Sequence, residues 1–65
     1  MLKFTVREIE LIKLLASGKS NQEIGKAMFI SVHTVKKILD NIYQKTCCHN
    51  RVQIAVYAIK NSLTE

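Results

Sequence analysis

The sequence predicts an all-α domain of four helices built around a helix-turn-helix. Three observations favour it: four helix-start patterns, apolar residues that recur at helical spacing, and no period-two alternation of the kind that marks an exposed strand. A chain of 65 residues is too short for two cores, so residues 1–65 are expected to form one domain.

The first helix is expected to run from the capping box Thr5-Val6-Arg7-Glu8 to about Ala16. In such a box the threonine oxygen accepts from the backbone of Glu8, and Glu8 reaches back to the amide of Thr5. Gly18 ends the helix, because glycine adopts the left-handed conformation without a Cβ penalty. Its apolar positions form one stripe, opposite the polar side of the helix: Ile9, Leu11, Ile12, Leu15 and Ala16.

A second capping box, from Ser20 to Glu23, predicts a short helix over about 21–28. Gly25 costs this helix about 1 kcal/mol relative to alanine. We therefore expect a close approach of the following helix there, near Val35. Three residues are expected to point inward: Ile24, Ala27 and Met28.

Two further caps predict the remaining helices. Ser31 caps a third helix of about 32–46, and Asn50, with Gln53 three residues on, caps a fourth of about 51–61. The connections between all four helices are short.

The charge of the chain is unevenly distributed. Ten Lys and Arg residues oppose five Asp and Glu residues, and in the stretch 26–60 the only acid is Asp40. A polyanion is the natural partner of such a field. The alternative is a solvated basic surface that only aids solubility.

The third helix divides into two faces on a helical wheel. Its polar face holds His33, Lys36, Lys37, Asp40 and Gln44. Its apolar face holds Val35, Ile38, Leu39 and Ile42. A helix of this kind fits the major groove of DNA, where lysine donates to guanine and Asp40 can accept from cytosine N4. We expect four of these polar residues to read base edges: His33, Lys36, Lys37 and Asp40.

Several side chains near helix ends are candidate phosphate contacts. Ser20 and Ser31 act either as caps alone or as phosphate ligands, whereas Thr34 has no capping role to explain it. Lys45 and Arg51 flank the loop after the third helix and are expected to clamp the DNA backbone. A solvated surface is the alternative for each of these two cations.

The fourth helix is apolar over more than half its circumference, whereas packing on one core needs a stripe of about 100°. Ile54 and Ala58 are expected in the core. The outward residues are expected to form a homodimer interface: Val52, Gln53, Val56, Ile59 and Lys60. The alternative is a thin domain that wraps this helix by itself.

Other function classes are disfavoured. A domain this small has little room for a catalytic pocket of about 300 Å³, so we expect no enzyme and no cofactor. Cys47-Cys48-His49 cannot converge on one tetrahedral metal ion, and adjacent cysteines form a strained disulfide. Without an apolar run of about 18 residues, a cytoplasmic location with reduced thiols is expected.

Six segments together resemble one known family: Thr5-x-Arg7-Glu8-x-Glu10, Ala16 to Ile24, Phe29-Ile30-Ser31, Thr34-Val35-Lys36, Asn41-Ile42-Tyr43-x-Lys45 and Asn50-Arg51-x-Gln53. They look like the LuxR-type (NarL/FixJ/GerE) DNA-binding domain of bacterial transcriptional regulators. The resemblance implies a helix-turn-helix over 20–39, a recognition helix that follows its turn, and a fourth helix that pairs two copies. It also places Lys36, Lys37 and Asp40 at base-reading positions, and Thr34 and Lys45 on the DNA backbone. Asn41 is a further expected phosphate contact.

The chain departs from this family at Val6, Ile38, Thr46 and the pair Cys47-Cys48, where the family usually has proline, histidine, leucine, and glycine before an aliphatic residue. The resemblance fits the output domain of a response regulator or quorum-sensing protein, or a freestanding regulator. RNA polymerase is a further candidate partner. The alternative function is an antagonist that pairs through the fourth helix without binding DNA, but it would not need the basic face of the third helix.

Overall fold

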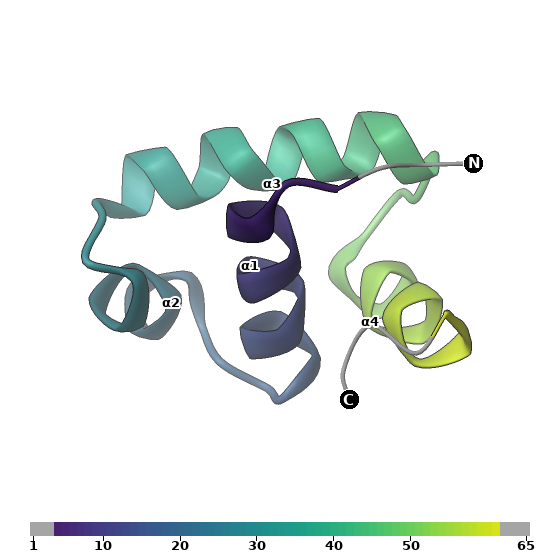
Figure 1. Ribbon diagram of the computed structural model, residues 1–65, viewed down its shortest axis with the longest axis horizontal. Coiled ribbons are helices and arrows are strands. Elements are labelled where there is room, and N and C mark those ends of the chain that lie inside the picture. Colours follow the sequence, from purple (N-terminus) through teal and green to yellow (C-terminus); the bar gives the residue numbers. More distant parts are fainter. Residues whose placement is uncertain (1–3, 62–65) are drawn as a thin grey trace.

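The computed structural model describes residues 4–61. Their helices are α1 (Val6–Ala16), α2 (Asn21–Met28), α3 (Val32–Thr46) and α4 (Arg51–Lys60). In Figure 1, α3 lies along one side of the molecule, α2 lies beneath its N-terminal end, and α4 lies beneath its C-terminal end. The central α1 contacts each of the other three helices. The predicted all-α, four-helix fold is confirmed.

The first two helices begin with the predicted capping boxes. Thr5 Oγ1 accepts from the Glu8 amide at 3.1 Å, and Glu8 Oε1 accepts from the Thr5 amide at 2.8 Å. Ser20 and Glu23 make the same pair of hydrogen bonds at 3.2 and 2.9 Å. The bond from the Ser20 amide is the main reason why the pKa of the exposed Glu23 lies below its ordinary value.

The last two helices are also capped as predicted. Ser31 Oγ accepts from the Thr34 amide, and Asn50 Oδ1 accepts from the Gln53 amide. The second pair is no reciprocal box, however, because Gln53 Oε1 accepts from the His49 amide at 2.5 Å. The Gln53 side chain therefore orders the residue before the cap.

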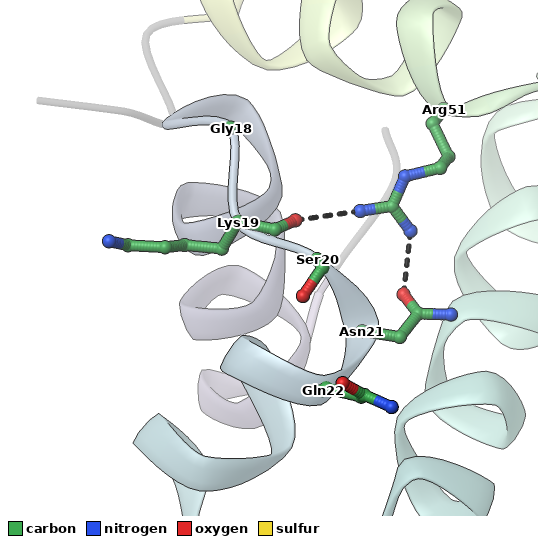
Figure 2. A pocket seen from close by; sticks show the side chains of 6 residues that line it. All are labelled: Gly18, Lys19, Ser20, Asn21, Gln22 and Arg51. Carbon is green, nitrogen blue, oxygen red and sulfur yellow. Dashed lines mark hydrogen bonds between the residues drawn. The ribbon is translucent and has the colours of Figure 1, made fainter.

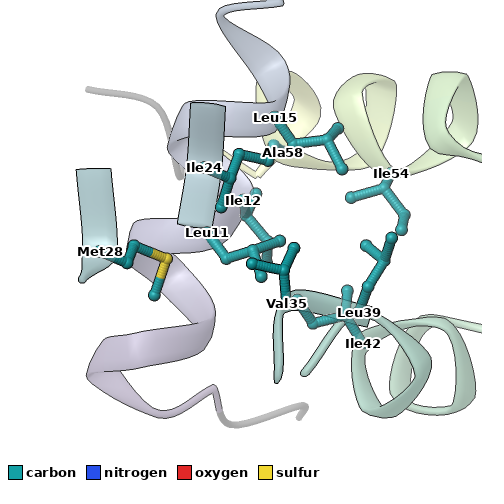
Figure 3. Close-up of a cluster of buried hydrophobic side chains, with 10 residues drawn as sticks. All are labelled: Leu11, Ile12, Leu15, Ile24, Met28, Val35, Leu39, Ile42, Ile54 and Ala58. Carbon is teal, nitrogen blue, oxygen red and sulfur yellow. The ribbon is translucent and has the colours of Figure 1, made fainter. Parts of the chain in front are cut away.

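The core is built from ten apolar side chains that come from all four helices (Figure 3). They are Leu11, Ile12, Leu15, Ile24, Met28, Val35, Leu39, Ile42, Ile54 and Ala58. The prediction that Ala27 points inward is wrong, since Ala27 is exposed. The buried face of α2 is formed by Ile24, Gly25 and Met28. Ala27 lies about 110° around the helix from the centre of that face.

Gly25 lies close against the turn that follows α2. A Cβ atom at Gly25 would lie 2.8 Å from the carbonyl oxygen of Ile30 and 3.6 Å from Cγ2 of Val35. The Gly25 carbonyl also accepts from the Ile30 amide at 2.9 Å. The predicted close approach is confirmed, and its tightest contact is with the turn backbone.

Three residues at helix ends have a positive φ: Gly18 at 94°, Phe29 at 59° and Cys47 at 58°. Gly18 follows the prediction for the end of α1. Phe29 and Cys47 end α2 and α3 in the left-handed conformation, which costs a residue with a Cβ atom roughly 1–2 kcal/mol. At Cys47 this is the position where the LuxR family usually has glycine.

Gly25→Ala is expected to lower the free energy of unfolding by about 1–3 kcal/mol, because the new methyl group overlaps the Ile30 carbonyl. Helix propensity alone predicts the opposite sign, a gain of about 1 kcal/mol. Urea denaturation followed by circular dichroism measures the difference. A variant more stable than the wild type would show that the approach of the turn does not constrain this position.

Candidate nucleic-acid interface

The polar face of α3 is on the outside of the domain, as the wheel predicts. His33, Lys36, Lys37, Asp40 and Gln44 are all exposed. On the opposite face the side chains of Val35, Leu39 and Ile42 are buried, while Ile38 is half-buried at the border. The core therefore holds α3 from one side only.

The polar side chains on this face have no partner in the part of the chain that the structure describes. Among residues 4–61, the side chains of His33, Lys36, Lys37 and Asp40 make no hydrogen bond or ion pair. A neutralised cation would gain little from a phosphate or a base, whereas these two lysines keep all their donor groups for a ligand.

The start of α3 carries a pair of hydroxyl groups. Ser31 Oγ and Thr34 Oγ1 lie 3.0 Å apart and share a hydrogen bond. The Thr34 side chain, at the third helical position, thus bonds the capping side chain itself and no backbone amide. The exposed Ser31 and the half-buried Thr34 stand beside the free amides at the positive end of α3.

Arg51 joins the start of α4 to the start of α2 (Figure 2). Its Nη1 donates to Asn21 Oδ1 at 2.6 Å, and its Nη2 donates to the Lys19 carbonyl oxygen at 2.9 Å. These residues line an open hollow together with Gly18, Ser20 and Gln22. The Lys19 side chain points away from the guanidinium in Figure 2. Arg51 thus has a structural role that its sequence position did not reveal.

Lys45 is also held inside the domain. Its Nζ lies 2.6 Å from Glu8 Oε1 and 5.8 Å from the ring centroid of Phe4. The Glu8 side chain is only 7% exposed and that of Lys45 is 35% exposed. Phe4 in turn packs edge-on against Tyr57 of α4, with ring centroids 6.0 Å apart. Sequence reasoning assigned Glu8 a capping role alone and missed this link between α1 and α3.

Burial by itself raises the pKa of Glu8, because it disfavours the charged carboxylate. The hydrogen bonds from Lys45 and from the Thr5 amide outweigh that effect, so the pKa of Glu8 lies below 4.5. The carboxylate is therefore ionised and paired at neutral pH.

The outer face of α4 is apolar. Val52, Val56 and Ile59 are 71, 44 and 66% exposed, whereas Ile54 and Ala58 are fully buried. The predicted division of this helix between core and surface is confirmed. Gln53 and Lys60 are exposed beside the apolar residues.

The remaining candidates form no site. Cys47 and Cys48 are free thiols. Within the described part of the chain, no three His, Cys, Asp or Glu side chains come together in a group that could hold a metal ion. In the same part of the chain, no helix is long and apolar enough to cross a bilayer.

A short helix, a tight turn and a longer helix with an outward cationic face define a helix-turn-helix domain. Residues 2–58 match the family described as bacterial regulatory proteins, luxR family, and the chain belongs to that family. The recognition made from the six sequence segments is therefore confirmed, and the chain is a LuxR-type DNA-binding domain.

Two relatives are named as regulators. The transcriptional regulatory protein LiaR of Bacillus subtilis is 48% identical over 59 residues, which is 91% of this chain and 28% of that protein. The response regulator protein VraR of Staphylococcus aureus is 41% identical over 61 residues, which is 94% of this chain and 29% of that protein. The chain thus spans less than a third of the length of either relative.

Below pH 4.5, the free energy of unfolding is expected to fall through protonation of Glu8. Its pKa is 4.5 without the fold and lower within it, so its contribution is complete above pH 4.5 and disappears as the pH falls through the folded value. Glu8→Gln should reduce stability by about 1.5–3 kcal/mol at neutral pH and flatten this acid dependence. Urea denaturation at a series of pH values measures both effects.

Glu10→Gln is the matched control, because Glu10 is exposed on the same helix and has no partner among the described residues. It should follow the wild-type curve. If Glu8→Gln followed that curve too, the Glu8–Lys45 pair would contribute no net stability.

Proposed function

We propose that the domain binds a specific double-stranded DNA site by placing α3 in the major groove. The observation that carries this proposal is the exposed polar face of α3, on which the side chains of Lys36 and Lys37 have no partner among the described residues. The apolar side of α3 is fixed by the core and α2 supports its N-terminal end, which is the arrangement that helix-turn-helix domains use.

On this proposal four residues read base edges: His33, Lys36, Lys37 and Asp40. Lysine is suited to guanine O6 and N7, and an acid is suited to cytosine N4. His33, Lys36 and Lys37 lie in the N-terminal half of α3, which is the part that contacts base edges in such domains, and Asp40 follows one turn after Lys36.

Six residues are proposed as contacts to the DNA backbone: Ser20, Ser31, Thr34, Asn41, Lys45 and Arg51. Ser20, Ser31 and Thr34 lie at helix N-termini, where amides and hydroxyls suit phosphate oxygens. Lys45 and Arg51 already bind groups of the domain, so any phosphate must be met by their remaining N–H donors. Asn41 is exposed on α3 beside the proposed base-reading residues.

We further propose that two copies pair through α4. The exposed residues Val52, Val56 and Ile59 support this, because three large apolar side chains on one short helix are costly to leave in water. Gln53 and Lys60 would lie at the rim of the interface. A two-fold dimer presents two copies of α3 to two half-sites.

The whole protein is proposed to be a cytoplasmic bacterial transcriptional regulator without enzymatic activity. The name of VraR favours the output domain of a response regulator, and a freestanding regulator is the alternative. RNA polymerase is a further proposed partner. An antagonist that only pairs through α4 remains a second candidate function, favoured by the apolar face of that helix.

Lys36→Ala is expected to weaken binding to a site selected from random duplexes by about 1–3 kcal/mol, through loss of a donor to guanine. Lys13→Ala is the control, since Lys13 is exposed on α1 outside the proposed interface. Fluorescence anisotropy at constant ionic strength measures both affinities. If the Lys36 variant bound as tightly as the wild type, the antagonist function would be favoured.

Ile59→Glu is expected to weaken self-association about tenfold or more, because it places a charge in the proposed apolar interface. Ile59 is 66% exposed, so the fold should persist. Val6→Glu changes an equally apolar residue that is 83% exposed on α1 and serves as the control. Sedimentation equilibrium with and without duplex DNA measures the association. Identical behaviour of the two variants would place the dimer contact elsewhere.

A further inference from the structure

We infer that Asp40 is a specificity determinant which, together with Lys36, requires a G·C base pair in the DNA site. The inference rests on the proposed docking of α3 in the major groove and names the base pair that this docking selects. Asp40 is the one acidic residue of α3, and it lies exposed among the cations of the polar face.

Asp40 is not explained by an ion pair within its own helix. Lys36 and Lys37 precede it by four and three residues, which are the spacings at which opposite charges on a helix meet. Even so, Asp40 makes no ion pair or hydrogen bond among the described residues. A negative charge interacts favourably with the helix dipole only in the first turn of a helix. Asp40 lies beyond the first turn of α3, so the dipole does not explain it either.

A carboxylate on this face weakens general attraction to DNA, because it repels the phosphates that the lysines attract. If α3 bound DNA by charge alone, Asp40 would only reduce its affinity. The carboxylate is useful where a base offers it a hydrogen-bond donor, and it is most costly where a base offers only acceptors. Its effect is therefore on the choice of sequence.

The major-groove edges of the bases decide which donor this is. Only cytosine N4 and adenine N6 carry amino groups there, and adenine adds the acceptor N7 beside its amino group. That second acceptor suits the amide of Asn or Gln and repels a carboxylate, so Asp40 is matched to cytosine. Guanine and thymine would face the carboxylate with their acceptors O6 and O4.

Lys36 supplies the complementary half of the readout. Residues four apart on a helix have Cβ atoms about 5–6 Å apart, so Lys36 and Asp40 address the same base pair or neighbouring pairs. Guanine presents O6 and N7 to a lysine, and its partner cytosine presents N4 to an acid. One donor side chain and one acceptor side chain on adjacent turns thus match a G·C pair, whereas an A·T pair offers the carboxylate only an amino group that lies beside the acceptor N7.

Selection of binding sites from a random duplex pool by the full chain tests this inference. The wild type should select cytosine at one position of each half-site, and thymine or guanine there should lower affinity by about 5- to 150-fold. Asp40→Asn should change the preference at that position from cytosine to adenine and leave the other selected positions as they are. Glu10→Gln removes the same charge from the exposed surface of α1 and should not change the selected sequence.

Three other outcomes would overturn the inference. If Asp40→Asn selected the wild-type sequence with only a general gain in affinity, as a lost charge would produce, Asp40 would be a background charge. If the wild type selected A·T pairs at every position, the match to G·C would be wrong while the proposed function held. If the wild type bound no duplex even at low ionic strength, the proposed function would fail and this inference with it.

Discussion

The close contact between Gly25 and the Ile30 carbonyl sets the angle at which α2 and α3 meet. With no side chain at Gly25, the turn folds back onto α2, and Val35 comes within van der Waals reach of the same point. This crossing buries one side of α3 and leaves the other side outside the domain. A larger residue would move α3 relative to its support, and the orientation of the whole polar face would change with it.

The basic residues of α3 and of the start of α4 divide into two groups with different tasks. Lys45 binds Glu8 and links α3 to α1, and Arg51 binds Asn21 and the Lys19 carbonyl and links α4 to the start of α2. Lys36 and Lys37 have no such partner among the described residues and remain available to a ligand. A structural cation near the interface can still add a phosphate contact, but it does so from a fixed position.

Two of the four helices present surfaces that the domain itself does not use. The polar face of α3 is the surface proposed to read base edges, and the apolar face of α4 is the surface proposed to pair two copies of the chain. The two surfaces lie on different helices, so pairing and DNA reading need not compete for the same residues. A small domain tolerates this because ten side chains shared by all four helices form one continuous core. Phe29 and Cys47 adopt the left-handed backbone conformation, so two of the tight connections between helices carry local backbone strain.

The sequence by itself determined the helices, their caps, the exposed face of α3 and the family, because each depends on residues three or four positions apart or on motifs read along the chain. Only the tertiary structure decided that Ala27 is exposed, and that Lys45 and Arg51 are held by groups 37 and 30 residues away. Such contacts depend on how the helices cross, and a helical pattern specifies which face is apolar without specifying the angle. Thr34 lies between these cases, since its bond to Ser31 is local but depends on a rotamer that the pattern does not reveal.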